Sequence, residues 1–440
     1  MNALADRGHL LRLLGVSFGI AVAVGEMIGP GILRTPSLVA AGVPVAALIL
    51  CLWAFGALHA LLQANVLAEL GTMLPRAGGQ YVFVHRAFGD AGGLIVGWTM
   101  WCAHIVGLAA SAIAFAEFLA AIWPSTASHT PVVAAGLVLV LFAANVVGLR
   151  EGRALQVITS IAKAALLILF VCAALWFLPE HPAPAPSQIS PSGFLAVAGA
   201  YQLIRGAYNG WHAPVYFAEE NVLPARSIPR SLFVGVMFTG TLYVVINATL
   251  LRSLGAAAMA SGPLPYLAVL GRIAGGWTPA LFAIGAMITA ASCANANVMI
   301  APRVLFALSR DRLLPAALQS VNRGGSPHYA FALSATVALV LSASGGFRFV
   351  FGMIGTLVTL ASLITEIAFF VLRAREPDLE RPWRAVIYPW LPAAVVATDA
   401  TLLVLFVLAD VRGAIVASML CALSLPIAVV ARSMRARTNT

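Results

Sequence analysis

The chain has 440 residues, of which 61% are apolar and 10% are charged, and its formal net charge is +10. A soluble domain carries about 25% charged residues, so this chain lacks the side chains that would cover a water-exposed surface. The composition excludes a soluble enzyme, a disordered chain and a secreted disulfide scaffold. The basic residues lie in short segments between apolar runs, which favours a membrane protein over a nucleic-acid-binding protein.

Twelve apolar stretches of the chain are long enough to cross a bilayer, since a helical span needs about 20 apolar residues. The sequence therefore predicts an all-α polytopic membrane protein with twelve transmembrane helices in a single domain, 1–440. The predicted spans are 13–40, 43–68, 92–121, 131–149, 154–178, 193–217, 231–251, 279–301, 328–346, 350–372, 389–408 and 412–431. Most of the 26 basic residues lie in alternate connecting segments, starting at the N-terminus. This separation predicts that both termini are cytoplasmic.

Two of the predicted spans contain residues that interrupt a helix. The first carries GEMIGPGILRTP, with Gly-Pro-Gly at 29–31, and the sixth carries RGAYNGWHAP, with Gly206, Asn209 and Gly210 at a similar depth. Irregular backbone at membrane depth is tolerated only where protein buries it or where it lines a watery cavity. The breaks begin the two halves of a ten-span unit, and such a pair indicates the binding site of an inverted-repeat transporter. A simple kink is the alternative for either break taken alone.

A broken helix exposes backbone groups that bind ions without a charged side chain. Free N–H groups at the start of one half-helix suit a carboxylate, and free carbonyl groups at the end of the other half suit an ammonium group. Two breaks that face each other therefore predict recognition of the zwitterionic head of an amino acid. Pro30 weakens the carboxylate side, because it has no N–H to donate.

Four long motifs resemble those of the amino acid–polyamine–organocation (APC) superfamily, in particular its L-type and related bacterial amino-acid permeases. They are GEMIGPGILRTP, AELGTMLPRAGGQYVFVHRAFGD after span two, GAYNGWHAPVYFAEENVLPARSIPRS from span six, and NVMIAPRVLFALSRDRLLP after span eight. The resemblance implies a LeuT-like 5+5 fold, with a first five-helix repeat (13–178), a second inverted repeat (193–372) and two additional C-terminal helices (389–431). By motif position it implies substrate contacts at Met27, Ile28, Gly29, Gly31, Gly206, Ala207 and Asn209.

Lys163 is the only lysine of the chain and lies in the apolar run QVITSIAKAALLILF of span five. A charge at the centre of a membrane helix costs about 2.5–3.5 kcal/mol on insertion scales, so such a residue indicates a function. Similar family members place a lysine here instead of a structural sodium ion, which implies a contact with the backbone near Ile28. Its expected polar neighbours in span eight are Ser292, Asn295 and Asn297. Two roles stay open for this lysine: a proton carrier that couples transport, and a fixed structural cation.

Two ionisable residues lie directly beside the breaks, Glu26 before the first and Arg205 before the second. Glu26 is a candidate for binding a substrate amine, for pairing with Arg34 or Arg205, or for proton transfer. Arg205 is also a candidate residue of the substrate site, because it lies directly before the second break. Glu366 and Asp399 are further acids within predicted spans, and the sequence indicates no partner for either.

Aromatic and charged residues are expected to close the site. Gly206 stands where L-type permeases commonly have an aromatic gate, so either the pocket is expected to be wider or the gate is expected at Tyr208 or Trp211. Trp101 in span three is a candidate for lining the pocket, with core or interfacial packing as its alternative. The charged residues after span six resemble a cytoplasmic gate network, whose members are Glu219, Glu220, Arg226 and Arg230. An exposed charge cluster of little energetic value is the alternative for these four.

Together these features predict a secondary active transporter that moves amino acids across the bacterial inner membrane by alternating access, as a proton symporter or an exchanger. The alternatives are a polyamine or amine permease or antiporter and, more distantly, a membrane-embedded enzyme. The sequence has no H-E-x-x-H, G-x-S-x-G or P-loop motif and no clustered Cys and His, so no catalytic residue, metal or cofactor is expected. The expected partners are an amino acid substrate, the lipid bilayer and a proton, without nucleic acid. The chain is expected to be a monomer or a homodimer.

Overall fold

The computed structural model describes residues 15–76, 78–147, 152–178, 193–262, 264–273, 276–322, 327–344 and 346–426. Within these ranges the regular structure is helical, without a β-strand. Nine of the described helical segments are long and apolar enough to cross a membrane, and two shorter apolar helices accompany them at His328–Ala343 and Val411–Pro426. This confirms a multi-pass helical membrane protein, whereas the number of twelve spans stays a prediction. The outermost residues of the predicted spans 13–40, 131–149 and 412–431 and both chain ends lie outside the described residues.

The first predicted span consists of two half-helices. Helix α1 (Val16–Met27) ends at Ile28, and α2 (Pro30–Gly42) begins directly after Gly29. Ile28 and Gly29 both have extended backbone, with ψ angles of 93° and −162°. Pro30 occupies the first position of α2, where an N–H would have no helical partner and the fixed φ of proline suits a helix.

The sixth predicted span is interrupted as well. Helix α7 (Gly193–Ala207) ends before a turn at 208–212, which α8 (Ala213–Tyr216) and the 3-10 turn η2 (Ala218–Glu220) follow. Gly210 has a φ of +109°, a conformation that glycine adopts without the steric penalty of a side chain. The range 193–217 is therefore one half-helix followed by short turns.

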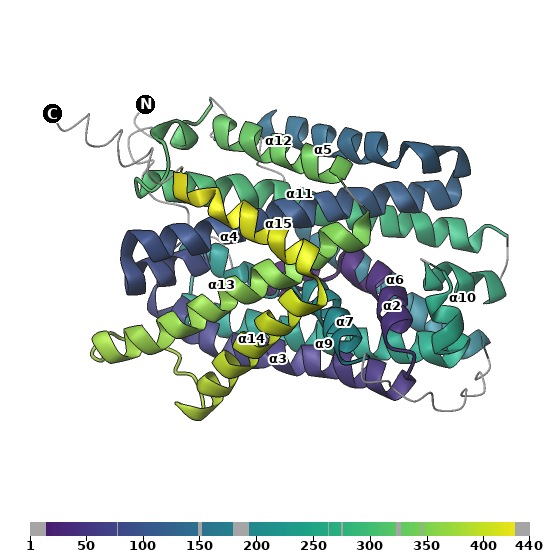
Figure 1. The fold of residues 1–440 in the computed structure, drawn as a ribbon, viewed down its shortest axis with the longest axis horizontal. Coiled ribbons are helices and arrows are strands. Elements are labelled where there is room, and N and C mark those ends of the chain that lie inside the picture. Colours follow the sequence, from purple (N-terminus) through teal and green to yellow (C-terminus); the bar gives the residue numbers. More distant parts are fainter. Residues whose placement is uncertain are drawn as a thin grey trace.

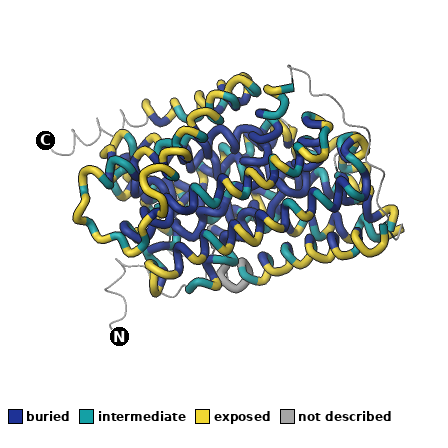
Figure 2. The backbone as a smooth tube through the Cα atoms, turned by 90° about the horizontal axis from the view of Figure 1, so that it is seen from below, coloured by how far each residue is buried: buried dark blue, intermediate teal, exposed yellow. Residues whose placement is uncertain are grey.

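Long helices form the scaffold around the two breaks. They are α3 (Ala46–Met73), α4 (Gln80–Ile122), α5 (Thr130–Val147), α6 (Gly152–Phe177), α9 (Pro224–Ala260), α11 (Thr278–Arg310), α12 (His328–Ser344), α13 (Phe347–Arg375), α14 (Trp390–Ala409) and α15 (Val411–Ala422). Helices α4 and α11 lie side by side, with the pair α5 and α12 on one side and the pair α3 and α9 on the other (Figure 1). Buried residues fill the interior and exposed residues line the outer faces (Figure 2). Exposed apolar side chains such as Trp176, Leu169 and Val132 suit a surface that faces lipid.

Shorter elements complete the scaffold. The chain after α3 was expected to lie outside the spans, yet it enters α4 at Gln80 and bends at Gly89, whose φ is +69°. Helix α10 (Pro265–Ile273) packs against α2, α6, α9 and α11, and Tyr266 on it donates a hydrogen bond to the carbonyl oxygen of Ile32 at 2.7 Å. The 3-10 turns η1 (Pro124–His129) and η3 (Ala316–Gln319) connect longer helices.

A buried ionic cluster ties the connection between α13 and α14 to α3. Both carboxylate oxygens of Glu69 accept hydrogen bonds from Arg373, at 2.8 and 2.5 Å. Arg381 lies 3.1 Å from the same carboxylate, and the backbone N–H of Ala385 donates to it at 2.7 Å. Removing one partner from such a cluster leaves buried charges uncompensated, which is strongly destabilising.

Candidate functional site

The two unwound stretches contact each other. A Cβ atom added at Gly31 would lie 2.8 Å from the Cα atom of Ala207, and one added at Gly210 would lie 2.6 Å from the Cβ atom of Glu26. Real Cβ atoms essentially never approach other atoms closer than 3.0 Å. Glycine is therefore required at both positions: the start of α2 lies against the end of α7, and the turn after α7 lies against the end of α1.

Tyr243 of α9 joins the two breaks through one hydroxyl group. The hydroxyl donates a hydrogen bond to the carbonyl oxygen of Met27 at 2.5 Å and lies 3.4 Å from the carbonyl oxygen of Ala207. A hydroxyl has a single hydrogen, so the shorter contact is the donated bond and the Ala207 carbonyl is the less satisfied of the two. This role was not predicted, because a lone tyrosine in the apolar run FTGTLYVVINAT is equally typical of core packing.

Lys163 lies at the C-terminal end of α1. Its ammonium group donates a hydrogen bond to the carbonyl oxygen of Gly25 at 2.9 Å, and the residue is 2% exposed. That carbonyl is one of the last four of α1, which have no partner within the helix, and a cation is favoured there by the helix dipole. The lysine therefore contacts the end of α1 at Gly25, three residues before Ile28.

The span-eight residues expected beside Lys163 have other described partners. Hydrogen bonds join Ser292 to Thr159 at 3.1 Å, Asn295 to Asn145 at 2.7 Å and Asn297 to His104 at 2.9 Å. Cys293 is the α11 residue that faces the break: its Sγ atom is 4.0 Å from the carbonyl oxygen of Glu26 and 3.0 Å from a Cβ atom added at Gly29. Its side chain has neither a hydroxyl nor an amide group, so it was not among the residues that the resemblance to a sodium site indicated.

Glu26 is buried at the end of α1, with 8% of its surface exposed. Its Oε1 atom has no hydrogen-bond partner among the described residues. The ammonium group of Lys163 bonds to the carbonyl oxygen of Gly25, the residue before Glu26, so a positive charge lies near this carboxylate at the end of α1.

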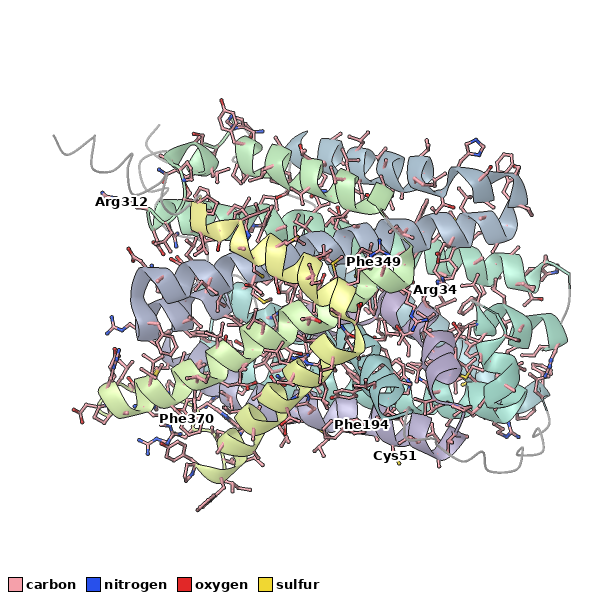
Figure 3. The ribbon with its side chains drawn as sticks, in the orientation of Figure 1. Arg34, Cys51, Phe194, Arg312, Phe349 and Phe370 are labelled. Carbon is pink, nitrogen blue, oxygen red and sulfur yellow. The ribbon has the colours of Figure 1, made fainter. Side chains whose placement is uncertain are left out.

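The two arginines expected as partners of this carboxylate have contacts elsewhere. Arg34 on α2 forms an ion pair with Glu117 of α4, with Nε 2.6 Å from Oε2, and its guanidinium group lies 5.3 Å from the ring centre of Phe347. Figure 3 shows Arg34 on α2, close to the start of α13. Arg205 donates a hydrogen bond to Ser362 of α13 at 3.2 Å. The Arg34 pair thus links α2 to α4 one turn after the first break.

The aromatic residues expected at the site have different surroundings. Tyr208 donates a hydrogen bond to the carbonyl oxygen of Trp53 at 2.9 Å, and its ring packs against the indole ring of Trp53. Trp211 is buried, and its indole N–H has no hydrogen-bond partner within the described ranges. Trp101 donates its N–H to Ser334 of α12 at 3.0 Å. It therefore packs between α4 and α12, without a described contact to either break, and we leave it out of the proposed site.

Phe351 of α13 covers the junction of the two breaks. Its ring lies 2.9 Å from a Cβ atom added at Gly31 and 3.0 Å from one added at Gly206. An aromatic ring thus lies beside Gly206, which stands at the position of the usual aromatic gate, but this ring belongs to α13 rather than to α7. Asn209, in the turn itself, has a buried Oδ1 atom without a hydrogen-bond partner in the described part of the chain.

The charged residues after the second break lie at the edge of the scaffold. Glu219 and Glu220 are partly buried, whereas Arg226 and Arg230 are exposed. Burial raises the pKa of the Glu220 carboxyl, and the positive charge of Arg303 on α11 opposes this shift. A positive charge on α11, in the motif that follows span eight, therefore acts on the Glu220 carboxyl.

Comparison with known proteins identifies the family. Residues 14–428 match the family described as amino acid permease. The serine/threonine exchanger SteT of Bacillus subtilis is 25% identical, over 89% of this chain and 90% of its own length. The branched-chain amino acid permease BcaP of the same organism is 24% identical over 90% and 88%, and the mouse b(0,+)-type amino acid transporter 1 is 25% identical over 90% and 82%. These relatives are transporters rather than enzymes, and the chain belongs to the amino acid permease family of the APC superfamily.

Proposed function

We propose that this chain is a secondary active transporter that moves neutral L-amino acids across the bacterial inner membrane by alternating access, with both termini in the cytoplasm. The observation that carries the proposal is the meeting of the two breaks, Gly31 against Ala207 and Gly210 against Glu26. The names of two similar proteins refer to serine, threonine and branched-chain amino acids, and we extend this neutral class to the present chain.

The carboxylate of the substrate binds at the start of α2. The N–H groups of Gly31 and Ile32 belong to the first turn, which has no helical acceptor for them, and the helix dipole favours an anion there. Pro30 contributes no donor. Backbone N–H groups thus recognise the carboxylate, so the residue at the contact has to be glycine, which has no side chain.

The ammonium group of the substrate binds at the end of α7. Two of the terminal carbonyl groups of α1 already have protein donors, since Gly25 accepts from Lys163 and Met27 accepts from Tyr243. Among the described residues, the side-chain contact of the Ala207 carbonyl is the one with the Tyr243 hydroxyl at 3.4 Å. A cation is favoured at this helix end, so we assign the ammonium contact to α7 rather than to α1.

Alternating access follows from hinges at the two breaks. We propose a LeuT-like arrangement of two inverted five-helix repeats, 13–178 and 193–372, followed by two additional helices within 389–431. Half-helices joined by Gly29 and by Gly210 change direction without distorting a continuous helix. The Arg34–Glu117 pair closes one side of the site, and the charged residues around Glu220 close the other.

Lys163 couples transport to ions in this proposal. Its hydrogen bond to Gly25 places a positive charge at the end of α1, where loss of the proton would release that helix end. Transport then proceeds as proton symport. If the lysine keeps its proton throughout, the same site supports amino acid exchange, and comparing driven uptake with exchange distinguishes the two.

A polyamine or amine permease is the second candidate. The buried Oε1 atom of Glu26, without a hydrogen-bond partner among the described residues, favours it, because a carboxylate would bind a second amine. The charge of Lys163 opposes it, since its ammonium group, bound to the carbonyl oxygen of Gly25, already places a positive charge near Glu26. An amine substrate would also leave the free N–H groups of α2 without an anion.

Counterflow into proteoliposomes tests the proposal. Vesicles containing the purified chain are loaded in turn with unlabelled serine, threonine, leucine, arginine or putrescine, and entry of the same labelled compound is measured. We expect accumulation of the neutral amino acids in wild-type vesicles and none with Gly31→Val, whose side chain enters the contact between the breaks. Accumulation of putrescine alone would favour the second candidate, and accumulation of no compound would contradict transport of this class.

A further inference from the structure

A second group of ionisable residues is buried on α3, α7, α13 and α14, none of which carries Lys163. Glu366 of α13 and Asp399 of α14 are 3% and 0% exposed. The amide nitrogen of Gln63 on α3 donates hydrogen bonds to both acids, at 3.0 Å to Glu366 and 2.7 Å to Asp399. One nitrogen atom thus contacts both carboxyl groups, which places the two acids close together. Two negative charges at one buried site repel each other, and a proton shared between the two carboxyl groups relieves this repulsion.

His59 of α3 extends this acid pair. Its Nε2 atom lies 2.8 Å from the Oδ1 atom of Asp399, and its Nδ1 atom lies 3.0 Å from the hydroxyl oxygen of Tyr201 on α7. With the proton on Nε2, a neutral imidazole donates to Asp399 and accepts from Tyr201; with a second proton it donates to both. The ring therefore stays hydrogen-bonded in either protonation state.

The charges of this group balance when it holds one extra proton. Arg205 places a permanent positive charge beside this group, because it donates a hydrogen bond to Ser362, one helical turn before Glu366 on α13. Among the described residues, no titratable side chain of α4 or α15 contacts the acid pair. With both acids ionised and His59 neutral, the group carries one net negative charge. One added proton makes it neutral, and a second makes it positive. Net charge is unfavourable at membrane depth, so the state with one shared proton is preferred.

A small cavity connects the acid pair to the second break. It has room for about one water molecule, and its lining includes Gln63, Gln80, Trp211, Ser362, Thr365 and Glu366. Four buried polar atoms of these residues have no hydrogen-bond partner among the described residues: Glu366 Oε2, Gln63 Oε1, Gln80 Oε1 and Trp211 Nε1. Three of them accept and one donates. One water has two hydrogens to donate and can accept the indole N–H, so it satisfies Trp211 and two of the three acceptors, within the two to four hydrogen bonds that a buried water makes.

We propose that Glu366 and Asp399, with His59, bind one transported proton, and that water in this cavity carries it between Glu366 and the second break. The inference rests on the proposed transport function. A hydronium ion in the open pathway gives its proton to the carboxylate pair and becomes water, and release reverses this step without any other change. Helix α7 carries Arg205 and ends at the substrate contact. Movement of α7 on substrate binding therefore changes the distance between the guanidinium group and Glu366, and with it the proton affinity of the pair.

Proteoliposomes separate proton-driven transport from exchange. Wild type, Glu366→Gln and a control, Thr401→Val, are compared for counterflow of labelled L-threonine, for its accumulation driven by an inward proton gradient, and for internal acidification reported by pyranine. Thr401 is an exposed α14 residue whose hydroxyl bonds to Ala397 of its own helix. We expect Glu366→Gln to keep counterflow and to lose accumulation and acidification to the level of empty vesicles, while Thr401→Val behaves as wild type. Driven accumulation by Glu366→Gln equal to that of wild type would overturn the proposal.

Infrared spectroscopy tests the proton site without any substrate. Spectra of the detergent-solubilised protein are recorded at acidic and alkaline pH, and the stretch of protonated carboxyl groups is compared between variants. We expect this band to be weaker in Glu366→Gln and in Asp399→Asn than in wild type and in Thr401→Val. A band of unchanged intensity in both acid variants would overturn the site even if transport is observed. A band with the expected losses, together with no transport of any amino acid by wild type, would count against the proposed function and not against the proton site.

Discussion

The contact between Gly31 and Ala207 provides the sharpest prediction. A Cβ atom at residue 31 would lie 2.8 Å from the Cα atom of Ala207, 2.9 Å from the ring of Phe351 and 3.0 Å from the Cβ atom of Ala207. Two of these three atoms belong to a helical backbone segment or are fixed directly to it. The Gly31→Ala variant therefore forces the start of α2 and the end of α7 apart, because no flexible side chain can yield.

The crowding around residue 31 determines how much substrate affinity the Gly31→Ala variant is expected to lose. Overpacking of this kind costs about 1–3 kcal/mol. If the strain falls on the substrate-bound arrangement of the two breaks, affinity decreases about 5- to 150-fold, since each 1.4 kcal/mol is a factor of about ten. Helix propensity alone would act in the opposite direction, because alanine is favoured over glycine in a helix by about 1 kcal/mol.

The measurement is the concentration dependence of amino acid counterflow, alongside the melting temperature of the purified protein. Gly42→Ala is the matched control, because Gly42 also lies on α2 and faces α7. A Cβ atom there meets its nearest neighbour, the carbonyl oxygen of Ala196, at an ordinary 3.6 Å. We expect the control to exchange substrate as wild type does and Gly31→Ala to lose affinity. Equal exchange by both variants would refute the reasoning that the breaks meet at residue 31.

Three further substitutions test other parts of the account. Lys163→Ala is expected to abolish proton-driven accumulation of amino acid while exchange continues, and unchanged accumulation would refute a coupling role for this lysine. Tyr243→Phe removes the donor to the Met27 carbonyl and is expected to cost about 1–3 kcal/mol, seen as a lower melting temperature, so a wild-type value would show that the bond contributes little. Glu69→Ala leaves the guanidinium groups of Arg373 and Arg381 without their carboxylate and is expected to cost about 3–5 kcal/mol, measured by unfolding in detergent. A Glu69→Ala protein as stable as wild type would contradict the buried ionic cluster.

The sequence alone predicts the parts of the architecture that depend on backbone chemistry, namely the spans and the helix breaks. Apolar runs predict spans, and Gly29 with Pro30 predicts the first break, because these residues favour leaving a helix inside an apolar run. The contact of Lys163 with the first break was expected only from the resemblance to permeases that carry a lysine at this position. The spans and the breaks, by contrast, depend on local composition alone.

Contacts between helices that lie far apart in the sequence could not be predicted in this way. Glu366 and Asp399 lie 33 positions apart in the chain, and their shared partner, Gln63, precedes them by hundreds of residues. Nothing in the local sequence of any of the three indicates the others. Phe351 likewise covers Gly206 only because α13 packs against α7. Cys293, rather than the expected Ser292, Asn295 or Asn297, faces the first break, because the packing of α11 decides which of its side chains points there.

The central claim is that backbone groups of both breaks hold the two charges of one substrate. Competition against exchange of labelled L-threonine tests it most directly, with threonine methyl ester, which lacks the carboxylate, and N-acetylthreonine, which lacks the ammonium group. We predict that unlabelled threonine inhibits exchange and that neither derivative does at the same concentration. Inhibition by either derivative as strong as that by threonine would contradict the claim.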